Sequence, residues 1–210
     1  MQKYTWLIFD FNGTIYNDLP LSVKIANYYL KQAHKPLTNV EEYRQEFEFP
    51  AINYYRKKGL VIKDSDFDYY KNDYPQRYLQ NETISLAPHA IVVLTELKKT
   101  YHLALISILN EEILQSQCAQ FGIAAYFEQI LGQNNVDSAS KLETAQRFVQ
   151  ERKLNPKEIL FIGDTMHDYE VAHNLGSACL LYDQGYQSHQ ILETSGCSVI
   201  SDFKEIKKYL

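Results

Sequence analysis

The residues best suited to chemistry are carboxylates that follow apolar runs near both ends of the chain. Residues 9–18 read FDFNGTIYND. Here Asp10 follows an apolar run and precedes a turn that contains Gly13. Residues 159–172 read ILFIGDTMHDYEVA, where a second apolar run ends at Asp164 and Asp168 follows four residues later. A carboxylate at the end of a buried strand is costly unless charge or hydrogen bonds offset its desolvation.

The spacing of these acidic residues indicates a cation site. Asp164 and Asp168 fall across the first turn of a predicted helix, where like charges repel unless a cation or a lysine lies between them. Mg²⁺ usually binds through one or two carboxylates together with phosphate and water, and Asp10 with Asp164 would supply such a pair. The simpler interpretations are a turn or cap role for Asp10 and helix N-terminal charge stabilisation by the other two.

These carboxylates would be positioned by an α/β fold, because short apolar runs alternate with longer amphipathic ones. The pattern predicts a doubly wound, mostly parallel sheet that binds ligands at the carboxyl ends of its strands. We expect strands at 5–11, 103–108, 129–131, 158–162, 178–182 and 198–200. We expect helices at 89–99, 111–121, 138–152, 166–175, 188–194 and 202–209. Asn110 is a predicted N-cap and Gly176 a predicted left-handed C-cap.

The segment 16–83 breaks this alternation, with helical signals and no convincing strand. Thr38 and Glu41 have the spacing of a capping box. We expect helices at 21–33, 39–48, 51–58 and 65–80. The sequence therefore predicts a core domain of 1–15 and 84–210, with 16–83 inserted as an all-helical cap, or lid, over the strand ends.

The composition limits the classes of partner. The 210 residues are 45% hydrophobic and carry a net charge of −5, so a packed core is expected and no global positive field would recruit nucleic acid or an anionic membrane. Three cysteines without CxxC spacing are typical of free thiols in a reducing compartment. The N-terminus does not read as a signal peptide and no run is long enough to span a membrane, so we expect a cytoplasmic protein.

Four motifs occur in order along the chain: Asp10-Phe11-Asn12-Gly13-Thr14, Ser107 in LALISI, Lys141 in SASK, and Gly163-Asp164 with Asp168. With these motifs the chain resembles the haloacid dehalogenase-like (HAD) hydrolase superfamily, in its phosphatase branch with a helical cap (phosphoglycolate phosphatase-like). The resemblance covers nearly the whole chain, including the helical insert. Singly, a strand-end serine or an exposed lysine is a weak signal, but the ordered set is specific.

The resemblance implies Mg²⁺-dependent hydrolysis of a small phosphate monoester. Asp10 would attack phosphorus and form an aspartyl-phosphate, which splits one difficult step into two. Asp10, Asp164 and the backbone carbonyl of Asn12 would hold Mg²⁺, which neutralises charge on the transferring group. The partner would be a small phosphorylated metabolite, with its identity and the oligomeric state left open.

The resemblance also implies a phosphate site. Ser107 and Lys141 would bind the phosphoryl oxygens, with Gly13 and Thr14 contributing to the same anion site. Asp168 would orient Lys141 or a metal-bound water.

Asn12 departs from the family pattern. Family phosphatases carry Asp at this position, which protonates the leaving alkoxide and then activates water. A carboxamide cannot do this near neutral pH, and losing a general acid–base costs on the order of 10²–10⁴ in rate. We interpret the protein as a weakened phosphatase in which Asn12→Asp gains turnover and substrates with acidic leaving groups lose least.

Other interpretations of Asn12 stay open at this point. The chain could be a phosphate-compound-binding or regulatory protein without turnover. It could belong to the phosphonate-cleaving branch, which needs a lid lysine such as Lys57 or Lys58. A dehalogenase, which needs no metal, is disfavoured by Asp164 and Asp168. His167 beside the site is a candidate proton carrier. Basic lid residues that could reach an anion are Arg44, Arg56, Lys57, Lys58 and Arg77.

Overall fold

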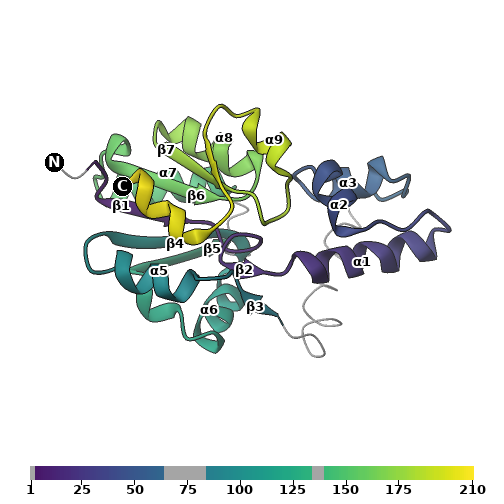
Figure 1. Ribbon diagram of the computed structural model, residues 1–210, viewed down its shortest axis with the longest axis horizontal. Helices are drawn as coiled ribbons and strands as arrows, with labels where there is room; N and C mark the ends of the chain where they lie inside the picture. The colour runs from purple at the N-terminus through teal and green to yellow at the C-terminus, as the bar shows by residue number, and fades with distance from the viewer. Residues whose placement is uncertain (1–2, 64–83, 134–139) are drawn as a thin grey trace.

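The computed structural model describes residues 3–63, 84–133 and 140–210. Figure 1 shows a layered α/β body on one side and a smaller helical part on the other. The main sheet has six parallel strands in the order β5-β4-β1-β6-β7-β8. These strands are β1 (Trp6–Phe9), β4 (His102–Asn110), β5 (Gln129–Gln133), β6 (Ile159–Gly163), β7 (Ala178–Tyr182) and β8 (Ser198–Ile200). The predicted parallel sheet is thus confirmed.

Helices cover both faces of this sheet, as the pattern predicts for a doubly wound fold. The alternation of side chains along β1 places Leu7 and Phe9 on one face and Trp6 and Ile8 on the other. The first face is covered by α5 (Ala90–Leu97), α6 (Glu111–Gln120) and the 3₁₀ helix η3 (Phe203–Tyr209). The second is covered by α7 (Lys141–Glu151) and α8 (Met166–Leu175). The remaining short elements are η1 (Ala124–Tyr126), η2 (Pro156–Glu158) and α9 (His189–Glu193).

Strand β1 lies at the point where the order in which strands are added to the sheet reverses. After β4 and β5 have been added on one side of β1, the chain crosses to its other side and adds β6, β7 and β8. Phe9 at the end of β1 is in register with Leu105 of β4 and Ile162 of β6. The residues that follow these three positions therefore converge at one edge, which is where doubly wound sheets bind ligands.

Two predicted caps are confirmed and one is wrong by a residue. The Asn110 side chain accepts the N–H groups of Glu112 and Ile113, and Gly176 ends α8 with φ of 74°. The predicted capping box at Thr38 and Glu41 is instead formed by Asn39 and Glu42. The Asn27 side chain binds both the N–H and the carbonyl of Thr38, each at 2.8 Å, and so holds the Thr38 backbone ahead of the helix start.

The last predicted helix, 202–209, forms but is the 3₁₀ helix η3 rather than an α-helix. It is seven residues long and packs Phe203 and Ile206 into the core. The tighter 3₁₀ turn brings residues three apart onto one face, which is the spacing of these two side chains.

The helical part contains α1 (Leu19–Gln32), α2 (Val40–Glu46) and α3 (Ile52–Lys57). Their apolar side chains form a hydrophobic cluster separate from the two that flank the sheet. The predicted helix 65–80 lies outside the described residues. The expectation of no strand here is wrong at its edge, since β2 (Tyr16–Asn17) pairs antiparallel with β3 (Ser85–Leu86). The chain leaves and re-enters the body at neighbouring points, so the two passing segments can pair their backbones.

None of the helices in the described ranges has the length and apolar character that crossing a membrane requires.

Candidate active site

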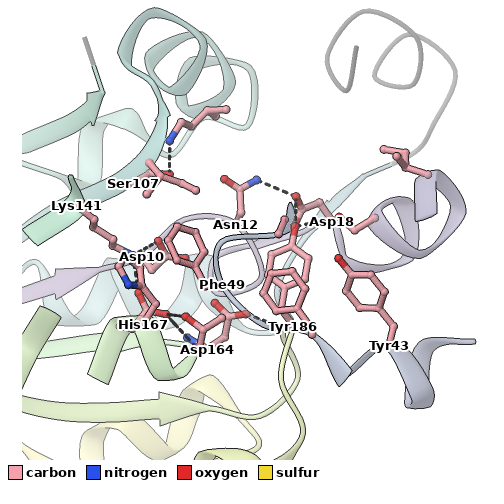
Figure 2. A pocket seen from close by; sticks show the side chains of 18 of the residues that line it. Asp10, Asn12, Asp18, Tyr43, Phe49, Ser107, Lys141, Asp164, His167 and Tyr186 are labelled. Carbon is pink, nitrogen blue, oxygen red and sulfur yellow. Dashed lines mark hydrogen bonds and ion pairs between the residues drawn. The ribbon is translucent and has the colours of Figure 1, made fainter. Parts of the chain in front are cut away.

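Three carboxylates and one ammonium group meet at the carboxyl ends of β1 and β6 (Figure 2). Asp10 follows β1, Asp164 follows β6, and Asp168 lies in the first turn of α8. One ligand atom from each of these buried residues lies within 4.8 Å of the others. Lys141 Nζ donates to Asp10 Oδ1 and, at 2.5 Å, to Asp168 Oδ1. The structure thus brings together residues 131 positions apart in the sequence.

Lys141 is held at the start of α7, where Ser140 and Glu143 form a capping box. Its side chain is only 3% exposed. Burial alone would lower the pKa of Lys141, but the charges and hydrogen bonds of Asp10 and Asp168 raise it above its usual range. Lys141 therefore carries its positive charge between the two carboxylates.

Asp168 is occupied by protein donors. Its Oδ2 accepts the backbone N–H groups of Asp164 (3.1 Å) and Thr165 (3.0 Å) and the Thr165 hydroxyl (2.7 Å). Burial would raise the pKa of Asp168, but Lys141 and these hydrogen bonds lower it. Asp168 is therefore ionised and holds the Lys141 ammonium group through their ion pair.

Asp164 lies in a cradle of glycines. Its Oδ1 accepts the Thr14 hydroxyl at 2.8 Å, and its Oδ2 accepts the Tyr186 N–H at 2.7 Å. A Cβ atom on either Gly13 or Gly185 would lie 2.2 Å from Oδ2, so both positions need glycine for this carboxylate to fit. Burial raises the pKa of Asp164 well above its usual range, and the charges of Asp10 and Asp168 raise it further.

This donor set fits a divalent cation. Burial raises the pKa of Asp10 to about 7, because the lowering by Lys141 is incomplete and the charge of Asp168 opposes it. The protein alone therefore disfavours the ionised forms of Asp10 and Asp164, and a cation between them would favour ionisation. The backbone carbonyl of Asn12 accepts no hydrogen bond within the described parts of the chain. Two carboxylates and a carbonyl are oxygen ligands of the kind that Mg²⁺ prefers.

The remaining predicted site residues divide into two groups. Asn12 and Ser107 line the same cavity as Asp10, and the Ser107 hydroxyl accepts the Leu109 N–H at 3.1 Å where the pairing of β4 with β5 shifts register. Gly13 and Thr14 are not among the lining residues. The Gly13 N–H donates to Tyr16 (2.8 Å) and Asp18 (3.0 Å), while the Thr14 hydroxyl donates to Asp164. These two residues therefore shape the surroundings of Asp164 rather than the cavity wall.

The cavity has a volume of about 210 Å³ and runs from the carboxylates into the helical part. The His167 ring stacks on Phe49 with centroids 4.1 Å apart, so this contact joins α8 to the helical segment. Burial lowers the pKa of His167, which favours its neutral form. The side of the cavity away from the sheet is apolar and aromatic, and consists of Ile25, Tyr43, Phe47, Phe49, Ala51 and Tyr55.

The basic residues of the predicted lid have other partners. Arg44 donates to the backbone carbonyls of Asp183, Gly185 and Gln187, which lie in the loop after β7. Arg77 lies outside the described residues. The other contacts are Arg56 to the Ile62 carbonyl, Lys57 to Glu48 and Lys58 to Glu46.

Sequence reasoning missed Asp18 and Tyr186, which lie beside Asn12 (Figure 2). Asp18 is 1% exposed and accepts hydrogen bonds from the Asn12 amide and the Tyr186 hydroxyl, each at 2.8 Å. The signal for Asp18 was its position before Leu19-Pro20, where an N-cap is expected. Asp18 is the N-cap of α1, yet its side chain makes no cap bond and points inward instead. No sequence pattern marks Tyr186, because its loop is placed by tertiary contacts.

Comparison with known proteins agrees with this geometry. The family model described as haloacid dehalogenase-like hydrolase matches residues 7–181. A phosphoglycolate phosphatase of Pasteurella multocida is 29% identical over 98% of both chains, and one of Haemophilus influenzae is 28% identical over 94% of both. A haloacid dehalogenase-like hydrolase of Streptococcus pneumoniae has the same fold, with a TM-score of 0.81 at 22% identity over 100% of this chain and 99% of its own. The chain belongs to the haloacid dehalogenase-like hydrolase family.

Proposed function

We propose that this protein is a Mg²⁺-dependent phosphatase that hydrolyses a small phosphate monoester through an aspartyl-phosphate on Asp10. The observation that carries the proposal is the placement of the Asp10 carboxylate, in contact with Lys141 and beside Asp164, at the floor of a cavity. Membership of a hydrolase family and relatives named phosphoglycolate phosphatase support the same reaction class.

In the first step a carboxylate oxygen of Asp10 attacks phosphorus. The bond between phosphorus and the leaving-group oxygen breaks, and its electron pair stays on that oxygen. Lys141 and Ser107 would bind the phosphoryl oxygens, and Lys141 also favours the ionised form of Asp10. In the second step water attacks the aspartyl-phosphate, which returns Asp10 and releases phosphate.

Mg²⁺ held by Asp10, Asp164 and the Asn12 carbonyl would neutralise charge on the phosphoryl group. Asp168 is the residue that positions Lys141, because its oxygens already accept hydrogen bonds from the protein. The Asp164 oxygens are oriented by Thr14 and by the Tyr186 N–H, so the ligand geometry is preorganised.

The segment 16–83 would act as a lid over a core of 1–15 and 84–210. Its described part supplies the apolar side of the cavity, where the leaving group would bind. The names of the relatives make phosphoglycolate one candidate substrate, and sugar phosphates and nucleotides are others. The carboxamide at position 12 leaves the leaving group without a proton donor at that site, so aryl and acyl phosphates should react fastest.

A substrate panel tests the proposal. The wild-type protein and Asp10→Asn are incubated with Mg²⁺ and with phosphoglycolate, a sugar phosphate, a nucleotide and an aryl phosphate, and released phosphate is measured. We expect wild-type turnover that needs Mg²⁺, no turnover by Asp10→Asn, and acid-stable labelling of the wild type alone by a radioactive substrate. Tight substrate binding without phosphate release would instead identify a phosphate-compound-binding protein, and turnover by Asp10→Asn would remove Asp10 from the mechanism.

A further inference from the structure

The side chain of Asn12 faces a second carboxylate rather than only the cavity. Asn12 Nδ2 donates to Asp18 Oδ2 at 2.8 Å. Because an ionised carboxylate only accepts hydrogen bonds, this contact orients the amide. Figure 2 shows the Asn12 oxygen turned away from Asp18. Asn12 lines the cavity, so its amide oxygen is the side-chain atom offered to a ligand.

Asp18 is itself fixed from several directions. Its Oδ2 also accepts the Tyr186 hydroxyl at 2.8 Å, and its Oδ1 accepts the Gly13 N–H at 3.0 Å. The Ser22 hydroxyl lies 3.0 Å from the Tyr186 hydroxyl and extends this network into α1. The donors to Asp18 come from residues 12 and 13 after β1 and from Tyr186 in the loop after β7, and Ser22 of α1 contacts the Tyr186 hydroxyl. A buried carboxylate held in this way cannot easily move away from position 12.

An acidic residue at position 12 would therefore meet Asp18. In Asn12→Asp, a carboxylate oxygen would occupy the place of Nδ2, 2.8 Å from Asp18 Oδ2. A carboxylate oxygen has no hydrogen to donate, so the hydrogen bond to Asp18 would be lost and two acceptor oxygens would face each other. The side chain at position 12 would then turn away from its present place.

We propose that Asp18 is a positioning residue that holds the Asn12 amide oxygen toward the reacting groups, and that position 12 can carry a working carboxyl group only when position 18 does not. This inference rests on the proposed phosphatase activity. It also changes the expectation from sequence, since Asn12→Asp alone should not gain turnover. The double variant Asn12→Asp/Asp18→Asn restores the hydrogen bond with donor and acceptor exchanged. Its carboxyl group at position 12 can then give a proton to the departing oxygen and take one from the attacking water.

A double-mutant cycle tests this proposal. Wild type, Asn12→Asp, Asp18→Asn and the double variant are assayed with Mg²⁺ on an alkyl phosphate and on an aryl phosphate with an acidic leaving group. We expect Asn12→Asp to be no faster than wild type. We expect the double variant to gain at least about 10-fold in kcat on the alkyl phosphate and much less on the aryl one, because only a poor leaving group needs the proton. Asp18→Asn alone should lower kcat on both substrates with little change in KM.

Asn39→Asp is the matched control, because it makes the same chemical change at an exposed cap where aspartate serves equally well. Its turnover and melting temperature should equal those of wild type. Melting temperatures without Mg²⁺ provide a readout independent of turnover: Asn12→Asp should melt lower, and Asp18→Asn should recover much of that loss in the double variant.

A gain by Asn12→Asp as large as that of the double variant would overturn the proposal. So would melting temperatures that are additive across the cycle. If no protein of the set, wild type included, turns over any substrate, the proposed function fails, and non-additive melting temperatures would still show that positions 12 and 18 are coupled.

Discussion

Gly185 lies against Asp164 so closely that a Cβ atom at position 185 would be 2.2 Å from Oδ2 and 2.4 Å from Cβ of that aspartate. The next residue, Tyr186, donates its N–H to the same oxygen at 2.7 Å. The loop after β7 thus forms one wall of the proposed metal site, although it contributes no metal ligand. A change in the conformation of this loop should therefore displace the Asp164 carboxylate while the protein stays folded.

Gly185→Ala should therefore weaken Mg²⁺ binding while leaving the protein folded. The added methyl group displaces the Asp164 carboxylate, and a displacement of about 1 Å at a reacting centre costs on the order of 10² in rate. The measurement is the rise in melting temperature with Mg²⁺ together with kcat. Gly176→Ala is the control, since its Cβ would meet nothing within 4 Å but its φ of 74° makes it mildly destabilising. If Gly185→Ala responds to Mg²⁺ like wild type, the inference that Asp164 needs glycine at position 185 is wrong.

Lys141→Met should destabilise the protein in the absence of metal and remove turnover. Breaking a buried ion pair by removing one partner costs roughly 3–5 kcal/mol, because the other partner stays buried without its counter-charge. Here two partners, Asp10 and Asp168, lose their shared cation. The free energy of unfolding in urea measures this loss, and Mg²⁺ should recover part of it through Asp10.

Lys208→Met is the comparison for Lys141, because it breaks an exposed pair with Glu205. Unfolding in urea and turnover should both be unchanged there. Equal stability of wild type and Lys141→Met would mean that the buried contacts contribute nothing.

The strands and the position of Asp10 at a strand end were predictable because their signals are local. The apolar runs before Asp10 and Asp164 predict both a strand and the residue at which it ends. The parallel order of the sheet brings those strand ends together. Lys141 could be placed because SASK also encodes the helix start, with Ser140 and Glu143 as a capping box. Each of these inferences needed only a short window and a fold class.

The partners of these residues were not predictable for the opposite reason. Asp18 has the sequence context of an N-cap, and only the approach of Tyr186 and Asn12 draws its side chain inward. The capping box moved from Thr38 to Asn39 because Asn27, from another helix, binds the Thr38 backbone. In each case contacts with residues distant in the sequence determine which conformation the segment adopts, and a local sequence pattern does not reveal those contacts.

The metal-free protein should lose stability as pH rises from about 4 to about 7, and Asp10→Asn should reduce that slope. The pKa of Asp10 is raised from 3.8 to about 7 in the folded state, so folding binds a proton there within this window. A group of this kind stabilises the fold fully below its unfolded pKa, and that contribution is lost as pH rises through the folded value. Asp164 acts in the same direction, whereas the lowered pKa of Asp168 acts only at lower pH.

Urea unfolding of wild type and Asp10→Asn in EDTA, at several pH values, gives the two slopes. Repeating the wild-type series with saturating Mg²⁺ should flatten the slope or reverse it, because the cation replaces the proton on the carboxylates. Parallel slopes for the two proteins would exclude Asp10 as the group that titrates.

Arg44→Gln should loosen the contact between α2 and the loop that orients Asp164. Arg44 donates to three backbone carbonyls of residues 183–187, and its own carbonyl accepts the Ser188 N–H at 3.0 Å. Without the guanidinium, amide hydrogen exchange at residues 185–188 should speed up and kcat should fall. Lys57→Gln, which breaks an exposed ion pair with Glu48, should change neither. Unchanged exchange in Arg44→Gln would mean that the loop holds its position without the Arg44 side chain, and that this contact does not orient Asp164.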